Sequence, residues 1–298
     1  MGGPDGVLLL DKPPGYSSTQ ALARVKRALG ARRAGHTGTL DPFATGLLPI
    51  ALGEGTKFSR FLIDSDKAYD ATIRLGHTST TGDIEGVISG GKSSFLPTLE
   101  EIGSVIPEFR GPISQVPPMH SALRVGGQRL YDLARAGVEL PRQPRSVIIK
   151  SLEIVNYVGE NLQISVKCSK GTYIRVLAED IGSRLGCGGY LVALRRTGSG
   201  PFSINRAVTL DDLQAQGAEL LPACIQPVEA LVGELPRVEL GLGAAQSLMH
   251  GQHPPARPDA PAGEAAMFGS HGNFLGVARA EGGRWVPVRL MGTGSVDP

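Results

Sequence analysis

The segment 162–168 alternates strictly between apolar and polar residues, and this pattern restricts the fold more than any other feature of the chain. Its apolar members are Leu162, Ile164, Val166 and Cys168. A period of two is typical of a strand that buries one face. The preceding segment 145–158 is also strand-like, and the order of strand-like and helix-like segments does not repeat as strand–helix–strand units. We therefore expect an α+β sheet protein rather than a doubly wound one.

Short apolar runs and helix-start patterns indicate the other elements. Further strands are expected at 6–10, 47–52, 68–75 and 190–194, and helices at 17–29, 56–63, 98–105 and 172–185. Two of the helices begin with a capping box, in which a hydroxyl and a polar side chain three residues later satisfy free amides. The two boxes are Ser17 with Gln20 and Thr98 with Glu101.

The composition changes near Leu235. From there to the last residue the chain is rich in Gly, Ala and Pro and holds short β-like pieces at 274–278 and 285–290. We expect a large domain over 1–232 and a small, β-rich domain over 233–298.

Cysteine content and the length of apolar runs indicate the compartment. The three cysteines are Cys168, Cys187 and Cys224, an odd number without a CxxC pair. A disulfide framework and a zinc site are therefore poorly supported, and a reducing cytoplasm fits best. No apolar run is long enough for a bilayer, and the run at 7–10 ends too early for a signal peptide. We expect a cytoplasmic protein without a membrane partner.

Basic residues gather in two runs, although the formal net charge is only +2. The first run lies between Asp11 and Asp41 and includes Arg32 and Arg33, with no acidic residue in the interval. The second run includes Arg124, Arg129 and Arg135. Clustered Arg and Lys on a near-neutral chain favour a polyanion-binding face. Either run taken alone is better explained as a solvated surface.

Residues 86–93, GVISGGKS, match the phosphate-loop pattern of nucleotide-binding proteins. That loop needs a strand before its first Gly and a helix after its Lys. Here polar residues precede Gly86, and Pro97 prevents a long helix from following Lys92. We interpret the match as accidental.

Residues 35–46, GHTGTLDPFATG, place a single carboxylate among small residues. Pro42 moves Asp41 out of the helical region, so the carboxylate is expected on a turn between elements. Binding and catalytic groups are often found on such turns. On this loop alone, a helix cap before Phe43 is the more common role for an Asp.

The same loop, followed by LLPIALGEGTKF, resembles the signature of the TruB family of pseudouridine synthases. Six further segments resemble family motifs in the same order: LLLDKPPG (8–15), DSDKAYDATIRLG (64–76), TTGDIEG (80–86), QVPPMHSALRVGGQRLYDLARAG (115–137), CSKGTYIRVLAEDIG (168–182) and LRRTGSGPF (194–202). The resemblance spans roughly the first two-thirds of the chain and is strongest to the bacterial, stand-alone members that act on tRNA.

The resemblance implies a fold and an activity. The fold is a central mixed, mainly antiparallel sheet flanked by helices and loops, followed by a small PUA-like RNA-binding domain. The activity is the conversion of uridine to pseudouridine at position 55 in the T loop of tRNA, without a metal or other cofactor. A stand-alone enzyme needs no obligatory protein partner, and the absence of a coiled-coil pattern favours a monomer.

The resemblance also assigns the central site residues. Asp41 matches the family nucleophile, which starts the cleavage of the C1′–N1 bond of uridine. Arg175 matches the arginine that pairs with this carboxylate, and Asp83 matches the residue that holds the arginine from its other side. Tyr69 matches the tyrosine that stacks on the target base. Without the resemblance, Arg175 fits a surface helix equally well, and Tyr69 fits a half-buried strand.

Further positions near the extruded nucleotide follow from the same motifs. They are His36, Tyr173, Leu194, Lys12 and Lys57. Taken alone, Leu194 is better explained as core, and His36 fits an idle loop residue equally well. Residues 112–140 resemble an insertion that closes on the T arm, so the RNA backbone contacts are expected from both basic runs: Arg124, Arg129, Arg135, Arg32 and Arg33.

Two other functions stay open. One is that of the archaeal or eukaryotic relative that works in a guide-RNA complex, against which the bacterial-type motifs argue. The other is a non-catalytic tRNA-binding or chaperone module, against which an intact set of Asp41, Tyr69 and Arg175 argues.

Overall fold

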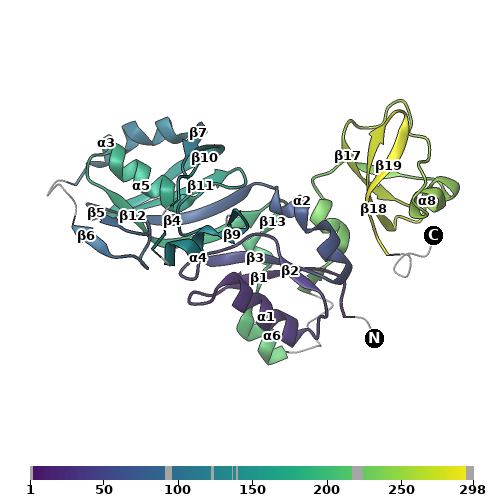
Figure 1. Cartoon of the computed structure of the whole chain (residues 1–298), viewed down its shortest axis with the longest axis horizontal. Helices are drawn as coiled ribbons and strands as arrows, with labels where there is room; N and C mark the ends of the chain where they lie inside the picture. The colour runs from purple at the N-terminus through teal and green to yellow at the C-terminus, as the bar shows by residue number, and fades with distance from the viewer. Residues whose placement is uncertain are drawn as a thin grey trace.

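A large mixed sheet forms the centre of the molecule (Figure 1). The structure is a computed structural model, and it describes residues 3–90, 96–121, 124–135, 137–138, 140–216 and 224–292. Within these residues the strand order is β14-β1-β3-β12-β4-β11-β10-β7, and β2, β13 and β15 pair with members of this row. The strands are β1 (Gly6–Lys12), β2 (Ala34–His36), β3 (Thr45–Leu52), β4 (Lys67–Leu75), β7 (Gly111–Gln115), β10 (Arg145–Val158), β11 (Asn161–Cys168), β12 (Gly189–Ser199), β13 (Phe202–Ser203), β14 (Val208–Thr209) and β15 (Ile225–Gln226).

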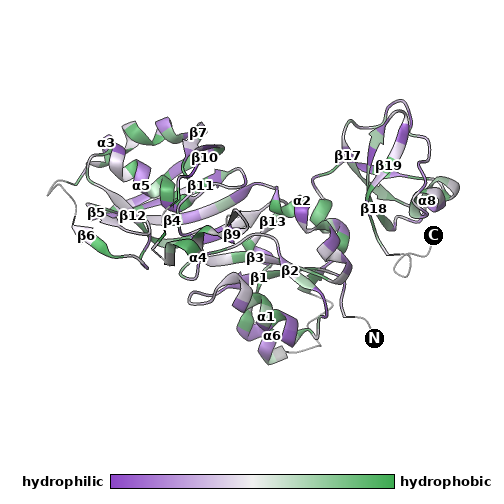
Figure 2. Ribbon diagram, in the orientation of Figure 1, coloured by the Kyte–Doolittle hydropathy of each residue, from purple (hydrophilic) through white to green (hydrophobic). Residues whose placement is uncertain are grey.

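Helices and two small hairpins flank this sheet. The helices are α1 (Ser18–Ala28), α2 (Ser59–Ile63), α3 (Leu99–Val105), α4 (Leu130–Arg135), α5 (Ile174–Arg184) and α6 (Leu210–Gln216), with the 3-10 turns η1 (Gly53–Phe58), η2 (Ile106–Phe109), η3 (Ile204–Arg206) and η5 (Val228–Val232). The hairpins are β5 (His77–Ser79) with β6 (Ile88–Gly90), and β8 (Arg124–Val125) with β9 (Gln128–Arg129). Helix α1 carries both hydrophilic and hydrophobic residues (Figure 2), and its buried members are Ser18, Ala21 and Val25.

The two halves of the sheet meet where β12 lies between β4 and β3. β12 runs antiparallel to β4 over most of its length, but it pairs with β3 in parallel at only two positions, Arg195 with Thr45 and Arg196 with Gly46. Most other pairings are antiparallel, so the expected mixed, mainly antiparallel α+β sheet is confirmed. The junction matters for function because the 35–46 loop enters the sheet there.

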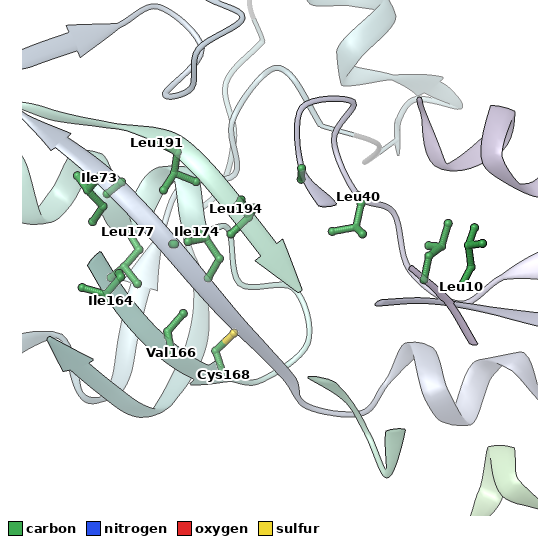
Figure 3. Packing of buried hydrophobic residues seen from close by; sticks show 14 of the residues in the cluster. Leu10, Leu40, Ile73, Ile164, Val166, Cys168, Ile174, Leu177, Leu191 and Leu194 are labelled. Atoms are coloured by element: carbon green, nitrogen blue, oxygen red, sulfur yellow. The ribbon is translucent and has the colours of Figure 1, made fainter. Parts of the chain in front are cut away.

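One apolar core extends across this junction. Its buried members include Leu10, Leu40, Ile73, Leu177 and Leu191. In Figure 3, Leu40 of the 35–46 loop lies between the residues packed around α5 and Leu10 of β1. The loop is therefore anchored by a buried leucine directly next to Asp41.

The sequence located most elements, and two expectations need correction. The expected helix at 56–63 is a 3-10 turn up to Phe58 and an α-helix only from Ser59. The expected strand at 190–194 continues to Ser199 and contains both Arg195 and Arg196. Both expected capping boxes are confirmed, at the starts of α1 and α3.

The phosphate-loop match adopts another structure in the part that is described. Residues Ile88–Gly90 form β6, which pairs with β5, where a phosphate loop would be open backbone. Residues 91–95 lie outside the described residues. None of the described helices is long and apolar enough to cross a membrane.

A second, smaller sheet follows at the C-terminal end (Figure 1). Its strands are β16 (Arg237–Glu239), β17 (Glu264–Phe268), β18 (Phe274–Glu281) and β19 (Arg284–Leu290), with helix α8 (Leu242–Met249). It packs on the first unit through an apolar cluster in which the ring centroids of Phe58 and Phe274 lie 5.2 Å apart. Arg60 and Glu264 form an ion pair beside it, at 2.6 Å. The boundary at 232/233 stays a prediction.

Candidate active site

Backbone and side-chain contacts hold every residue of the loop from 38 to 42. Arg196 donates to the carbonyls of Gly38 and Thr39, and Ser18 exchanges hydrogen bonds with the backbone of Leu40. The carbonyl of Pro42 accepts from Lys12 Nζ and from the amide of Gly15. β3 begins at Thr45, so no helix follows for Asp41 to cap, and the capping interpretation is wrong. The loop presents Asp41 from a fixed backbone.

Arg175 lies opposite Asp41 and is almost fully buried, with 4% of its surface exposed. Its Nε is 3.1 Å from Asp41 Oδ2, and its Nη1 is 3.3 Å from Asp83 Oδ2. The guanidinium also donates to the carbonyls of Thr81 and His120. Arg175 is the second residue of α5, so the helix start places its side chain over the loop. One guanidinium therefore joins four chain segments around the carboxylate.

Asp83 is the second carboxylate beside Arg175, and it is buried, at 2% exposure. The Thr81 hydroxyl donates to its Oδ1 at 2.5 Å, and the amide of Glu85 donates to the same oxygen at 3.0 Å. Ser79 also donates to its backbone carbonyl. These bonds fix the β5–β6 turn and satisfy the hydrogen-bonding capacity of the buried carboxylate. Asp83 is therefore held in place and orients the Arg175 guanidinium.

The electrostatics of the site follow from burial. Burial raises the pKa of Asp41 above its usual value, and the Arg175 guanidinium opposes that rise. Burial also raises the pKa of Glu85, and repulsion from Asp83 and Asp41 raises it further. Burial lowers the pKa of Lys12 to about 8, while attraction to Asp41 opposes this. A partly buried carboxylate that has a cation partner is suited to act as an ionised nucleophile.

Tyr69 reaches the same region from β4. It lies beside Arg196 on the neighbouring β12 and beside Val166 on β11. Burial raises the pKa of the Tyr69 hydroxyl, and the positive charge of the Arg196 guanidinium opposes this rise. The ring therefore lies on the sheet face that carries Arg196.

Lys12, His36 and Leu194 lie close to this group. Lys12 is fully buried and donates to the carbonyls of Pro13, Tyr16 and Pro42. His36 ends β2, and burial and then Arg196 lower its pKa. Leu194 is a core residue of β12, opposite Ala71.

Tyr173 stands immediately before α5. Its backbone amide and carbonyl both bond to the side-chain amide of Gln115, at 3.0 and 3.2 Å. The guanidinium of Arg145 lies 4.6 Å from the centroid of its ring. Tyr173 is thus held two residues from Arg175 with its ring against a cation.

The structure does not bring Lys57 to Asp41. β3 has eight residues, which separates its far end from Thr45 by about 23 Å. Lys57 lies in η1 beyond that end and pairs with Glu54 at 2.6 Å. Glu54 also accepts from the amide of Gly292 at 2.6 Å, and Arg33 lies 3.9 Å from it. Lys57 therefore lies beside Glu54, the residue of this group that bonds to the C-terminal segment.

The expected RNA backbone contacts divide into two groups. Arg32 is exposed in the turn before β2, and Arg33 follows it. The side chains of Arg124, Arg129 and Arg135 lie outside what the structure describes, although β8, β9 and α4 contain these residues. Among the described residues no group of three or more His, Cys, Asp or Glu side chains could hold a metal ion.

A family model described as "TruB family pseudouridylate synthase (N terminal domain)" matches residues 26–174, half of the chain. The chain belongs to the TruB family. Two C-terminal models continue the match, "tRNA pseudouridylate synthase B C-terminal domain" over 175–233 and "Pseudouridine synthase II TruB, C-terminal" over 236–291. The family resemblance of the sequence motifs is thereby confirmed.

Relatives of this TruB chain match over nearly its full length. A protein of Aromatoleum aromaticum named tRNA pseudouridine synthase B is 50% identical over 290 residues, covering 97% of this chain and 93% of its own. One of Thiobacillus denitrificans with the same name is 48% identical over 289 residues, covering 97% and 96%. A chain of a solved Cbf5-Nop10-Gar1 complex has a TM-score of 0.75 at 28% identity, over 96% of this chain and 84% of its own. The expected pseudouridine synthase fold is confirmed.

The sequence motifs predicted no role for three residues that lie against the residues of the TruB site: Glu85, Gln115 and Arg196. They also predicted none for Lys67, which is buried and donates to three carbonyls around the end of α2. Arg196 follows Arg195 after an apolar run, a position typical of a strand's exposed end. Only the pairing of β12 with β3 and β4 reveals that it is buried.

Proposed function

We propose that the chain isomerises uridine to pseudouridine at position 55 in the T loop of tRNA, with Asp41 as the nucleophile. The chain belongs to a family of pseudouridine synthases, and the relatives that match it over nearly their full length are named for action on tRNA. The choice of the T loop and the role of Asp41 are our proposal. The observation that carries it is the ion pair between the partly buried Asp41 and the buried Arg175, which also pairs with a second carboxylate, Asp83.

The reaction breaks and forms one bond each at C1′ of the ribose. The C1′–N1 bond is cleaved with help from the Asp41 carboxylate, the freed uracil rotates, and C1′ bonds to C5. C5 then loses its proton and the freed N1 carries one, so the product is an isomer of the substrate. All atoms of the base are retained, so the step needs no oxidant and no second substrate. Arg175 contributes by keeping Asp41 ionised and oriented through its planar donors.

A uridine in a folded RNA is stacked, so it must leave the stack to reach Asp41. Tyr69 offers a ring for the extruded base on the sheet face next to the loop. Tyr173 and His36 are proposed to line the same pocket, and Lys12 supports the loop from behind through Pro42. Leu194 contributes as a core residue under this face.

The rest of the chain is proposed to bind the RNA backbone. The catalytic unit covers 1–232, and the residues proposed to contact phosphates are Arg124, Arg129, Arg135, Arg32 and Arg33. The β-rich unit over 233–298 is proposed as a second, PUA-like RNA contact. We propose a monomer without an obligatory protein partner, acting in the cytoplasm, where three free cysteines are ordinary.

The test is to incubate the purified protein with unmodified tRNA transcript and map pseudouridine at nucleotide resolution. The expected product is a single pseudouridine at position 55, and a T-arm stem-loop should also be modified. A transcript with cytidine at that position serves as the matched control. Pseudouridine only outside the T loop, or none, would overturn the proposal.

A further inference from the structure

Arg196 is a fully buried arginine whose acceptors are backbone carbonyls rather than a carboxylate. It is 2% exposed, and its side chain is the largest of the fully buried ones among the described residues. Its Nε donates to the carbonyl of Leu47 at 2.7 Å, Nη2 to that of Gly38 at 3.2 Å, and Nη1 to that of Thr39 at 3.4 Å. Burying a guanidinium is costly, so a chain that keeps one there gains rigidity or function from it.

The three carbonyls lie on both sides of Asp41. Gly38 and Thr39 precede it, and Leu47 lies in the strand that follows the loop. One planar guanidinium therefore ties the entry and the exit of the loop to the same point. Because the donors of arginine have a fixed fork geometry, this arrangement also fixes the distance between the two arms.

The strand register brings Tyr69 to the same guanidinium. Tyr69, Arg196 and Gly46 lie in one row across β4, β12 and β3. Tyr69 and Arg196 are directly opposite each other on neighbouring strands, and the positive charge of Arg196 opposes the burial that raises the pKa of the Tyr69 hydroxyl. At Gly46 (φ 100°), a Cβ atom would lie 2.4 Å from the carbonyl oxygen of Arg196, so only glycine allows β3 to approach β12 this closely.

We propose that Arg196 is a positioning residue for catalysis: it sets the Asp41 loop and the Tyr69 ring in one geometry from behind the pocket. This inference rests on the proposed roles of Asp41 and Tyr69. Arg196 does not touch the reacting atoms, and it acts through the two residues that do. A lysine could satisfy one carbonyl but could not bridge both arms of the loop and Tyr69.

The test compares Arg196→Lys with Arg195→Lys as a matched control. Arg195 is the adjacent arginine of the same strand, but it is 43% exposed and pairs with Asp11 at the surface. Three quantities are measured for each protein: the single-turnover rate of pseudouridine formation at saturating T-arm RNA, the Kd for that RNA, and the Tm.

For Arg196→Lys we expect the rate to fall about 100-fold while the Kd stays within about threefold of the wild type, because a small misplacement of reacting groups has effects of this size. The Tm should fall by a few degrees at most, and Arg195→Lys should keep the wild-type rate. A rate within about threefold of the wild type would overturn the proposal. So would parallel losses of rate, RNA affinity and Tm, which indicate a purely structural role.

A double-substitution cycle tests the link to Tyr69. Tyr69→Phe removes the hydroxyl from the residue opposite Arg196, so its effect on the rate should be strongly non-additive with that of Arg196→Lys. Additive effects would remove Tyr69 from the proposal. The wild-type rate in the same assay distinguishes a failure of the proposed function from a failure of the role proposed for Arg196. An inactive wild type contradicts the proposed function, whereas an active wild type with an equally active Arg196→Lys contradicts only the role of Arg196.

If Arg196→Lys does not fold, the hydrogen bonds of Arg196 can be tested by NMR on the native protein. With ¹⁵N-labelled arginine, the Arg196 guanidinium should show separate, slowly exchanging Nη protons, because three carbonyls hold it. Arg195, partly exposed, should show averaged, rapidly exchanging protons in the same spectrum. Averaged, rapidly exchanging signals for Arg196 would overturn the proposal.

Discussion

The Arg175 guanidinium lies 3.1 Å from the Asp41 carboxylate, although Arg175 belongs to the first turn of helix α5 and Asp41 lies in the loop before β3. The same guanidinium binds Asp83 and the carbonyl of His120. His120 lies in the proposed RNA-gripping insertion, so Arg175 contacts the proposed nucleophile, the second carboxylate and that insertion with a single side chain. A substitution at Asp83 or a displacement of the His120 segment should therefore change the position of Arg175 relative to Asp41.

Asp41→Asn should abolish pseudouridine formation while RNA binding stays nearly unchanged. The amide cannot act as a nucleophile, and rate losses for removed catalytic groups are on the order of 10⁴-fold or more. Product should be quantified on a T-arm stem-loop, with Kd measured in parallel. Asp70→Asn, an exposed carboxylate on β4, is the matched control. A rate near that of the wild type would remove Asp41 from the chemistry.

Arg175→Gln should move the acidic limb of the pH–rate profile upward. Burial already raises the pKa of Asp41, and the guanidinium opposes that rise. Without the cation the ionised form is less favoured, so the pKa of Asp41 rises further, and the rate should decline at a higher pH as the solution is acidified. Single-turnover rates across the acidic range measure this. An unchanged limb would show that Arg175 does not control this ionisation.

Combined substitution of Arg124, Arg129 and Arg135 by Ala should weaken RNA binding and flatten its salt dependence. Each lost phosphate contact reduces the slope of log K against log salt by about 0.7 to 0.9. Binding isotherms at several salt concentrations give the slope. Arg184→Ala removes an exposed arginine that pairs with Glu108, and it should leave the slope unchanged. A wild-type slope for the triple variant would exclude these residues from the backbone contacts.

Glu179 should make the protein less stable as the pH rises. Burial, reinforced by repulsion from Asp180, raises the pKa of Glu179 from 4.5 to about 7 in the folded state. Between these two values the folded state binds more protons than the unfolded state, so the free energy of unfolding falls as the pH rises through this range. Glu179→Gln should lack this decline. Urea unfolding at several pH values measures it, and equal declines in both proteins would contradict the assignment.

Phe58→Ala should destabilise the contact between the two units. Phe58 is fully buried and packs on Phe274 of the C-terminal sheet. Truncating a buried phenylalanine costs about 3–5 kcal/mol of unfolding free energy. Phe61, which is only partly buried, should lose less on the same change. Denaturant titration provides both numbers, and equal losses would argue against a special role for Phe58.

Local patterns located most of the fold because they act over a few residues. The capping boxes at Ser17 and Thr98 place α1 and α3, and the alternation at 162–168 places β11. The helix expected at 56–63 failed in its first half. That half belongs to a 3-10 turn that starts at Gly53. In this turn the amide of Glu54 bonds to Asp5, and the amide of Gly292 bonds to the Glu54 side chain, and no local pattern records these contacts with distant parts of the chain.

The candidate site divides in the same way. Family motifs named Asp41, Asp83 and Arg175, which the structure brings together. They also named Lys57, which lies beyond the far end of the eight-residue strand β3 and pairs with Glu54 instead. No motif named a role for Arg196, because its burial depends on the pairing of β12 with two other strands.

The sequence by itself determined the periodic elements, the family and a carboxylate on a small-residue loop, because propensity, capping and motif spacing are encoded locally. Only the tertiary structure decided which charges are buried, and therefore which pKa values shift. Burial of a charge depends on what the strands and loops from distant parts of the chain place around it. At Asp41 that surrounding consists of Arg175 from α5, Lys12 from β1 and a loop held by Arg196 from β12.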